Sequence, residues 1–305
     1  MSEPVIVVND LLKVYGAFTA VDHISFEVHP GEIFGLLGPN GAGKTSSLES
    51  LEGLRTPDGG EIKVAGVNPA KEFRKLRNKI GVQLQSSALP ETIRVEEAMN
   101  FFCAYHGVRP RYDLLDRFGL SEKRKAQYHQ LSVGQQRRLA LALAVAHEPS
   151  VLFLDEPTSG LDVASRVDLH NLMREQKETG TTIVLATHDM AEAEEMADRI
   201  TIMLSGRIVS AGTPLELTAT GKGLTKVSVR TEGTSLGKRE AGFPAVNQQV
   251  IKGDYAIYYS TDIGPTVSAI ISHVENLGDT LIDLRVERPS LEDRFLEITK
   301  GGEDR

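Results

Sequence analysis

The sequence predicts an α/β fold with a parallel core sheet and a small α+β region towards the C-terminal end. Short apolar runs alternate with segments of helical spacing, a pattern typical of strands that are covered on both faces. In addition, the glycine-rich stretch GPNGAGKT lies between an apolar run at residues 33–37 and a segment with leucines at helical spacing. Because ligands bind at the carboxyl ends of strands in such sheets, polar residues at those ends are the candidates for a site.

At 305 residues, the chain has the length of two domains, or of one large domain with an appendage. The pattern predicts strands at residues 5–9, 24–28, 33–37, 79–85, 151–155 and 181–189, a turn and a short strand within residues 56–66, and a closing pair at 200–204 and 206–212. It predicts helices at residues 45–54, 95–126, 163–178 and 191–199, and one that starts near Gly134 and stops before Pro149.

Beyond about Thr220 the composition becomes polar and glycine-rich, so we expect a domain boundary there. The pattern after it predicts strands at residues 226–230, 255–260 and 281–287, a helix at 264–276, and a last helix with Leu291, Phe295 and Leu296 on one face. We therefore expect a main domain over residues 4–220, with a helical part at about 86–147, and a small α+β domain over residues 221–305.

The stretch GPNGAGKT matches G-x-x-x-x-G-K-[ST], the phosphate-binding P-loop, in the strand–loop–helix context that the motif requires. Its glycines let the backbone approach phosphate oxygens, and the loop amides and helix N-terminus direct positive partial charge at them. Lys44 adds a full charge for the β- and γ-phosphates, and the Thr45 hydroxyl can ligate Mg²⁺. The nucleotide-binding residues predicted in this loop are Gly38, Pro39, Asn40, Gly41, Ala42, Gly43, Lys44, Thr45 and Ser46.

Two adjacent carboxylates end the apolar strand at residues 151–155. In ATPases with a P-loop, an aspartate in this place holds Mg²⁺, usually through water, and Asp155 fits that role. Glu156 is then placed to orient the attacking water and accept its proton. Because adjacent strand residues point in opposite directions, the two carboxylates need not both bind the metal. The alternative is an acidic strand end that only caps the next helix, and the P-loop weighs against it.

Three further side chains have two interpretations each. Gln85 ends a predicted strand, where its amide can reach Mg²⁺ or the attacking water, or can be a polar exit residue. His188 ends another strand, where its imidazole can hydrogen-bond a γ-phosphate or can be structural. Tyr15 can stack on adenine, although an isolated tyrosine does not establish this. The metal-ligand candidates are therefore Thr45, Gln85 and Asp155, and the catalytic candidates are Glu156, His188 and Gln85.

A second anion-binding element is predicted at LSVGQQRR, residues 131–138. Ser132 precedes Gly134 at the start of a long helix, so its hydroxyl, the backbone amides and the helix dipole together attract an anion. Two phosphate-binding elements in one chain allow two arrangements. Either both bind one nucleotide, or each binds a nucleotide held by a different copy, in a two-fold dimer with two nucleotides at its interface.

Charge and composition argue against several classes of protein. The net charge of -8 and the pI of about 5.6 disfavour nucleic-acid binding, which usually requires a basic domain. The single cysteine, Cys103, excludes an intrachain disulfide framework and a cysteine-based zinc site, and is most simply a buried core thiol. No secretory signal opens the chain, and its longest apolar run, residues 139–146, is too short to span a membrane. We expect a soluble intracellular protein that binds no nucleic acid.

Taken together, these residues resemble the nucleotide-binding subunits of ABC transporters over about residues 4–220, in that family's order and spacing. GPNGAGKT is similar to Walker A, VLFLDE to Walker B, LSVGQ to the signature LSGGQ, and SGLD at 159–162 to the D-loop. Gln85 resembles the Q-loop glutamine, His188 the switch histidine and Tyr15 the aromatic A-loop residue. The resemblance implies a P-loop NTPase fold of the ABC ATPase type, with a mixed-sheet core and a helical subdomain, and with ATP and Mg²⁺ as its ligands.

The resemblance also implies a head-to-tail dimer with a second copy or a homologous ATPase subunit. In it, Ser132, Gly134 and Gln135 of one copy close on ATP held by the other, Glu156 is the general base, and Asp162 helps to organise the interface. There is one departure from the family's pattern. Val133 replaces the first glycine of the signature, and its β-branched side chain restricts the backbone at that point. Because Gly134 remains, we expect the amide contact to survive.

Direction and partners rest on the resemblance as well. The segment after Gln85, residues 157–200 and the late PSLEDRFLEIT are similar to the drug-, antibiotic- and polysaccharide-export branch of bacterial ABC systems, in which a separate membrane permease pairs with the ATPase. We expect an ATPase that powers export of a drug, antibiotic or other amphiphilic substrate, held by its permease on the cytoplasmic face of the cell membrane. The alternatives are an importer ATPase, a soluble ABC-type ATPase outside transport, and a scaffold that binds ATP without hydrolysing it.

Overall fold

The computed structural model describes residues 3–85, 89–219, 224–233, 235–236, 242–287 and 290–295. The chain forms two compact units, Met1–Pro214 and Leu215–Arg305. The domain limits predicted at residues 220 and 221 stay a prediction. Within the described ranges, no helix is both long enough and apolar enough to cross a membrane.

The first unit contains nine labelled strands among the described residues. They are β1 (Ile6–Tyr15), β2 (Phe18–Val28), β3 (Ile33–Leu37), β4 (Gly59–Val64), β5 (Ile80–Gln83), β6 (Val151–Asp155), β7 (Thr182–Thr187), β8 (Arg199–Leu204) and β9 (Arg207–Gly212). The helices are α1 (Lys44–Leu51), α2 (Phe73–Leu76), α3 (Val95–Tyr105), α4 (Tyr112–Arg117), α5 (Val133–Val145), α6 (Val163–Glu178) and α7 (Met190–Met196), with 3₁₀ turns η1 (Ser121–Lys123) and η2 (Tyr128–Gln130). Helix α8 (Pro214–Ala219) begins at the boundary between the units.

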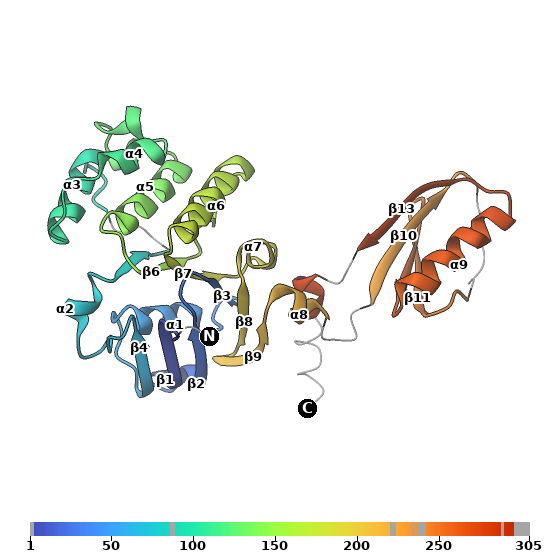
Figure 1. The fold of residues 1–305 in the computed structure, drawn as a ribbon, viewed down its shortest axis with the longest axis horizontal. Helices are drawn as coiled ribbons and strands as arrows, with labels where there is room; N and C mark the ends of the chain where they lie inside the picture. The colour runs from blue at the N-terminus through green and yellow to red at the C-terminus, as the bar shows by residue number, and fades with distance from the viewer. Residues whose placement is uncertain are drawn as a thin grey trace. The chain divides into compact units, whose positions relative to one another are not determined.

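Two sheets enclose the helix that follows the P-loop. One has the order β5-β6-β7-β3-β8-β9 and is parallel except for β9, which pairs antiparallel with β8. The other has the order β2-β1-β4 and is antiparallel. Helix α1 lies against strands of both sheets (Figure 1). The main apolar core contains side chains from the helix and from both sheets. The predicted α/β fold is confirmed, and the carboxyl ends of β6, β7 and β3 lie side by side.

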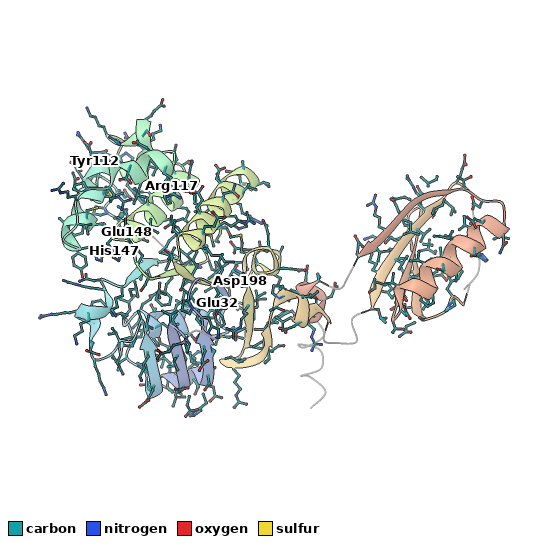
Figure 2. The ribbon with its side chains drawn as sticks, in the orientation of Figure 1. Glu32, Tyr112, Arg117, His147, Glu148 and Asp198 are labelled. Atoms are coloured by element: carbon teal, nitrogen blue, oxygen red, sulfur yellow. The ribbon has the colours of Figure 1, made fainter. Side chains whose placement is uncertain are left out.

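Strand β3 is buried along its whole length and leads directly into the P-loop. Two acidic side chains, labelled in Figure 2, hold its start. Glu32 Oε1 accepts a hydrogen bond from Arg199 Nη1 at 3.0 Å. Asp198 accepts one from the backbone N–H of Ile33 at 2.7 Å and one from Lys177 Nζ at 2.6 Å. These contacts tie the beginning of β3 to β8 and α6, so the P-loop extends from a rigid strand.

Helices α3, α4 and α5 form the helical part of the first unit (Figure 1). The helix predicted over residues 95–126 is divided into α3, α4 and η1. Gly107 and Gly119 adopt φ of 71° and 67° directly after the C-caps of α3 and α4, and this left-handed backbone ends both helices. Cys103 is buried in α3, with its Sγ 3.5 Å from Met99 Sδ, so the predicted core thiol is confirmed.

The first two strands are longer than predicted. Strand β1 continues to Tyr15, because the Asn-Asp pair after Val8 is an irregularity in its pairing with β2 and not a turn. Strand β2 begins at Phe18. Asp10 adopts a left-handed φ of 56°, and its backbone N–H donates to Ser25 Oγ at 2.9 Å. Asn and Asp tolerate this conformation in turns and bulges alike, so their presence does not distinguish the two.

The second unit is an α+β sheet of β10 (Thr225–Thr231), β11 (Val246–Lys252), β12 (Tyr255–Ser260) and β13 (Leu281–Glu287), with α9 (Ile263–Asn276) along one face (Figure 1). Its order is β11-β12-β10-β13, and all pairs are antiparallel. Strand β11 was not predicted because its sequence, VNQQVIK, is polar. Of the predicted last helix, residues 291–295 are helical and Leu291 is buried, whereas Leu296 lies outside the described residues.

Candidate nucleotide-binding site

The P-loop passes very close to two neighbouring strands. Gly43, the residue before α1, has a φ of 101°, and a Cβ there would lie 2.3 Å from the carbonyl oxygen of Ala20 in β2. A Cβ on Gly38 would lie 2.4 Å from the carbonyl oxygen of Met203 in β8. Glycine is therefore required at both positions, and the packing of the core determines the path of the loop.

The remaining loop residues surround this close contact. Asn40 and Gly41 are exposed, Pro39 and Ser46 are half-buried, and Ala42 is buried with its backbone N–H donating to the Pro39 carbonyl at 3.1 Å. The exposed backbone of the loop lies beside the N-terminus of α1, which is the arrangement that binds phosphate oxygens.

Lys44 is buried and folds back over its own loop. Its Nζ donates to the carbonyl oxygens of Gly38 at 2.7 Å and Pro39 at 3.1 Å, and lies 3.8 Å from Glu156 Oε1. Burial lowers the pKa of Lys44, while the negative charges of Glu156 and Asp155 act in the opposite direction. The ammonium group is thus a cation in a poorly hydrated position, where a phosphate would provide a stronger partner than two carbonyls.

Thr45 and Asp155 form the second pair in the cluster. Thr45 Oγ1 donates to Asp155 Oδ2 at 3.0 Å, and the buried Asp155 Oδ1 has no hydrogen-bond partner among the described residues. Burial raises the pKa of Asp155, the hydrogen bond from Thr45 lowers it, and the charge of Glu156 raises it further. A buried, unpartnered carboxylate oxygen beside a hydroxyl is a donor set that suits Mg²⁺, which prefers oxygen ligands.

Glu156 is where several of the predicted residues meet. Gln85 Nε2 donates to its Oε2 at 3.1 Å, and His188 Nδ1 lies 2.9 Å from its Oε1, which also faces Lys44. The strand ends at Asp155, and Glu156 itself has a left-handed φ of 47°. As expected, the carboxylates of Asp155 and Glu156 have different partners. The cause is the left-handed backbone at Glu156, however, and not the alternation of side chains along a strand.

Gln85 lies two residues beyond β5, so its predicted place at a strand end is wrong. The pairing of β5 with β6 ends at Gln83, opposite Leu154. The next carbonyls face α5 instead: Arg137 Nη1 donates to the Leu84 carbonyl at 3.4 Å and to the Gln85 carbonyl at 2.7 Å. The sequence did not single out Arg137, because a contact between a helix and a distant loop leaves no local pattern.

The signature segment lies apart from this cluster. Ser132 caps α5, and its Oγ accepts from the Gln135 N–H at 3.2 Å, while Gln135 Oε1 accepts from the Ser132 N–H at 3.0 Å. Asp162 caps α6 through the N–H and Oγ of Ser165, both at 2.9 Å. A Cβ on Gly134 would lie 2.7 Å from Ser165 Oγ, so the two helix starts adjoin. Among the described residues, no hydrogen bond or ion pair joins Ser132, Gly134, Gln135 or Asp162 to the P-loop cluster.

Tyr15 also lies outside the cluster of bonded residues. It ends β1, is partly exposed, and faces Lys13 Nζ and the Arg55 guanidinium, which lie 5.3 Å and 5.9 Å from its ring centroid. Its aromatic face is accessible in part, as stacking on a base requires, but no contact in the described residues links it to the P-loop.

Comparison with known proteins identifies the family. Residues 21–159 match the family model described as ABC transporter. The chain is 36% identical to the daunorubicin resistance ATP-binding protein DrrA3 of Streptomyces coeruleorubidus, over 100% of this chain and 98% of that protein. The chain belongs to the ABC transporter family. This ABC protein is also 36% identical to the Nod factor export ATP-binding protein I of Paraburkholderia xenovorans, over 98% of both chains. It is 32% identical to the linearmycin resistance ATP-binding protein LnrL of Bacillus subtilis, over 95% of this chain and 97% of that protein.

Solved structures agree with this assignment. An ATP-binding subunit of an ABC transporter superposes with a TM-score of 0.66 and 28% identity, over 70% of this chain and 92% of that one. For cbiO1 of Clostridium perfringens, part of the ABC transporter complex cbiONQ, the TM-score is 0.64 and the identity is 30%, over 72% of this chain and 92% of that one. The predicted family and P-loop fold are therefore confirmed, and this chain is a nucleotide-binding ATPase of the ABC type.

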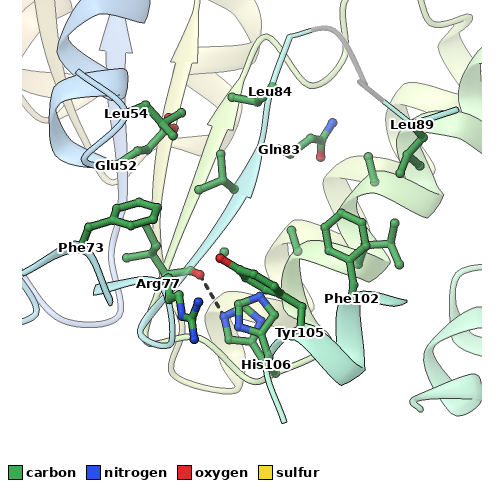
Figure 3. A pocket seen from close by; sticks show the side chains of 17 residues that line it. Glu52, Leu54, Phe73, Arg77, Gln83, Leu84, Leu89, Phe102, Tyr105 and His106 are labelled. Atoms are coloured by element: carbon green, nitrogen blue, oxygen red, sulfur yellow. Dashed lines mark hydrogen bonds between the residues drawn. The ribbon is translucent and has the colours of Figure 1, made fainter. Parts of the chain in front are cut away.

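A groove of 330 Å³ runs along β5, the strand at one edge of the parallel sheet (Figure 3). The core and the helical part of the ABC ATPase both line it. Four large side chains of its lining, Leu54, Phe73, Leu84 and Tyr105, are each at least 40% exposed. Because Leu84 directly precedes Gln85, this apolar surface adjoins the residue that contacts Glu156.

Proposed function

We propose that this ABC protein is the ATP-hydrolysing subunit of an exporter whose membrane-spanning part is a separate permease. The observation that carries the hydrolytic part of the proposal is the position of Glu156. Its carboxylate contacts Gln85 and His188 and faces Lys44 of the P-loop, while the adjacent Asp155 contacts Thr45. A scaffold that only holds ATP would not need a base oriented beside the phosphate-binding lysine.

Each side chain of the cluster then has a role in ATP hydrolysis. Lys44 leaves its two carbonyl partners and binds the β- and γ-phosphates, for which it is the stronger donor. Glu156 accepts the proton of the attacking water, since it is the carboxylate nearest to Lys44. Gln85 and His188 bond to different oxygens of Glu156, so they hold its carboxylate in one orientation.

Thr45 and Asp155 are the residues that would hold Mg²⁺, with Gln85 as the third candidate. The unpartnered Asp155 Oδ1 and the adjacent Thr45 hydroxyl support this choice. When bound, the ion supplies positive charge that stabilises the transferring phosphoryl group.

The signature segment supports a head-to-tail dimer, either of two copies or with a homologous subunit. Ser132, Gly134 and Gln135 begin a helix whose N-terminus suits an anion, yet no bond in the described residues links them to the P-loop of the same chain. A second chain that presents this segment to the P-loop would complete the site. Val133 is 53% exposed at the same helix start, and Asp162 lies on the adjoining one, so both would face the partner.

Export is the direction that the relatives support. Proteins similar over nearly the whole chain are named for resistance to daunorubicin and linearmycin and for Nod factor export. The exposed apolar rim of the groove offers a contact surface for a permease, which would hold the protein at the cytoplasmic face of the cell membrane. A movement of this rim would be transmitted to Glu156 through Leu84 and Gln85.

The first test is the variant Glu156→Gln, which keeps the shape of the side chain and removes the base. We expect the ATPase rate to fall by about 10²- to 10⁴-fold, with an ATP-bound dimer accumulating. Glu148→Gln is the matched control, because Glu148 lies on the surface in an ion pair with Arg111. A near-normal rate in Glu156→Gln would remove Glu156 from the role of base.

The same variant tests the transporter assignment. Tagged Glu156→Gln protein is isolated from native membranes with Mg-ATP after gentle solubilisation, and integral membrane proteins that co-purify are identified by mass spectrometry. Recovery of a multi-span permease supports the proposal. A permease accompanied by a substrate-binding protein would favour an importer, and soluble dimer or ribosomes without a membrane protein would favour an ATPase outside transport.

A further inference from the structure

Within the described part of the chain, Arg137 is the one residue of LSVGQQRR whose side chain bonds to the backbone of Leu84 and Gln85. It lies on α5, and its half-buried guanidinium donates from Nη1 to the Gln85 carbonyl at 2.7 Å and the Leu84 carbonyl at 3.4 Å. The shorter of these is a charge-assisted hydrogen bond of ordinary length. A helix side chain therefore holds the backbone of the residue that contacts Glu156.

These carbonyls have no partner in the sheet because they follow the end of a strand. The β5–β6 ladder stops at Gln83, so β6 does not take up the carbonyl of Gln85. Arg137 takes that place. Once the backbone of Gln85 is held, its side chain extends to Glu156, where Nε2 donates to Oε2 at 3.1 Å. The orientation of the Gln85 amide thus depends on a donor that comes from another element.

The same helix carries the signature. Ser132 is the N-cap of α5, and Arg137 lies on the helix that it caps. A rigid helix that moves at its start also moves at Arg137. A continuous route runs along α5 from its start to Arg137, then from Arg137 to the Gln85 backbone, and from the Gln85 amide to Glu156.

We infer that Arg137 is a positioning residue for ATP hydrolysis, which holds Gln85 against Glu156. Because Arg137 lies on α5, the alignment of Gln85 with Glu156 depends on the position of this helix. The inference rests on the proposed role of Glu156 as the base. Within the described residues Arg137 bonds to the Leu84 and Gln85 backbone and not to Glu156, so it acts on the base through Gln85. In the assembled dimer, closure of α5 on the nucleotide of the partner copy would set the base of its own site at the same time.

The test separates alignment from binding. In Arg137→Ala we expect kcat for ATP hydrolysis to fall about tenfold, because a misplaced positioning group costs rate, while KM for ATP changes by less than about twofold. Arg137→Lys keeps one charged donor and should recover part of kcat. Arg117→Ala, which removes an arginine paired with Glu175 in the same helical part, is the matched control and should keep the full rate.

A double-variant cycle decides whether Arg137 acts through Gln85. If it does, Arg137→Ala adds no further loss of kcat to Gln85→Ala. An equal loss in both backgrounds, or an unchanged kcat in Arg137→Ala, overturns the inference. Thermal melting is recorded for every variant, and Arg137→Lys carries the same comparison if Arg137→Ala does not fold.

The failure of this inference is distinguishable from failure of the proposed function. If Glu156→Gln and Gln85→Ala lose activity while Arg137→Ala does not, only the role of Arg137 is wrong. If Glu156→Gln and Gln85→Ala keep a normal rate, the proposed base is wrong as well.

Discussion

The two predicted phosphate-binding elements of this ABC protein differ in how they are built. The P-loop is packed between β2 and β8 so closely that two glycines are required. Its Thr45 donates to Asp155 at the end of β6, and its Lys44 faces the adjacent Glu156. The signature segment is held by its own cap, in which Ser132 and Gln135 bond to each other, and the neighbouring Val133 is 53% exposed.

This difference separates two tasks. The proposed P-loop half lies within one chain, and the packing of the core determines the path of its loop. The signature half is a preformed helix start, in which the side chains of Ser132 and Gln135 bond to each other's backbone. In the proposed dimer, the site would be completed only when two chains meet on the bound ATP, which would give the nucleotide control over assembly.

The largest expected effect compares one variant from each half. Lys44→Ala removes a buried cation from the phosphate-binding loop, so the Kd of the separate chain for ATP should rise about 100-fold. Ser132→Arg places a bulky charge at the signature and should leave this Kd within about twofold, while abolishing the ATP-dependent dimer. Binding is measured with a fluorescent ATP analogue at protein concentrations below dimerisation. Equal losses of affinity in both variants would mean that one chain forms the whole site.

A smaller effect concerns the rigidity of the P-loop half. Gly43→Ala introduces a Cβ that meets the Ala20 carbonyl at 2.3 Å in a left-handed backbone, and we expect a loss of about 3 kcal/mol in the free energy of unfolding. Gly180→Ala is the control: Gly180 has a φ of 95° but no atom within 4 Å of a Cβ, so it should lose only about 1 kcal/mol. Urea unfolding measures both, and equal losses would show that the P-loop tolerates the clash.

The smallest expected effect concerns the histidine pair that joins the helical part, which carries the signature, to the core. His106 at the end of α3 stacks on His147, with 3.7 Å between ring centroids, and His147 Nε2 contacts the Ile80 carbonyl of β5 at 2.9 Å. Burial, and then the proximity of His147 and Arg77, lowers the pKa of His106 to about 4 from its ordinary 6.5.

The sign of the pH effect follows from this lowered pKa. Between pH 6.5 and 4 the unfolded chain binds a proton at His106 that the folded chain does not, so this contribution to stability is complete above pH 6.5 and is lost as the pH falls towards 4. In His106→Gln, the difference in Tm between pH 7.5 and pH 5 should be smaller than in the wild type. The exposed His129 provides the control His129→Gln, which should keep the wild-type difference. An unchanged difference in His106→Gln would contradict the prediction.

Sequence reasoning succeeded where the chemistry lies within a few consecutive residues. The P-loop, Asp155 with Glu156, and His188 each directly follow a buried strand, so apolar runs locate them and the parallel sheet brings them together. Gln85 was assigned to the wrong element, because where a strand ends depends on where its neighbour stops pairing. Arg137 could not be found, since its partners are backbone carbonyls distant in sequence. The bulge at Asp10 was mistaken for an interruption because its residues suit turns as well.

The most direct test of the divided site is to mix two variants in a Glu156→Gln background, one with Lys44→Ala and the other with Ser132→Arg. Each alone should fail to form an ATP-dependent dimer, since every site it builds lacks one half. Mixed together, they can form one intact site, from the P-loop of the Ser132→Arg chain and the signature of the Lys44→Ala chain. We predict that ATP restores a dimer of one tagged and one untagged chain, seen by affinity capture and size-exclusion chromatography. No recovery of the mixed dimer, with both variants folded, would contradict a site shared between two chains.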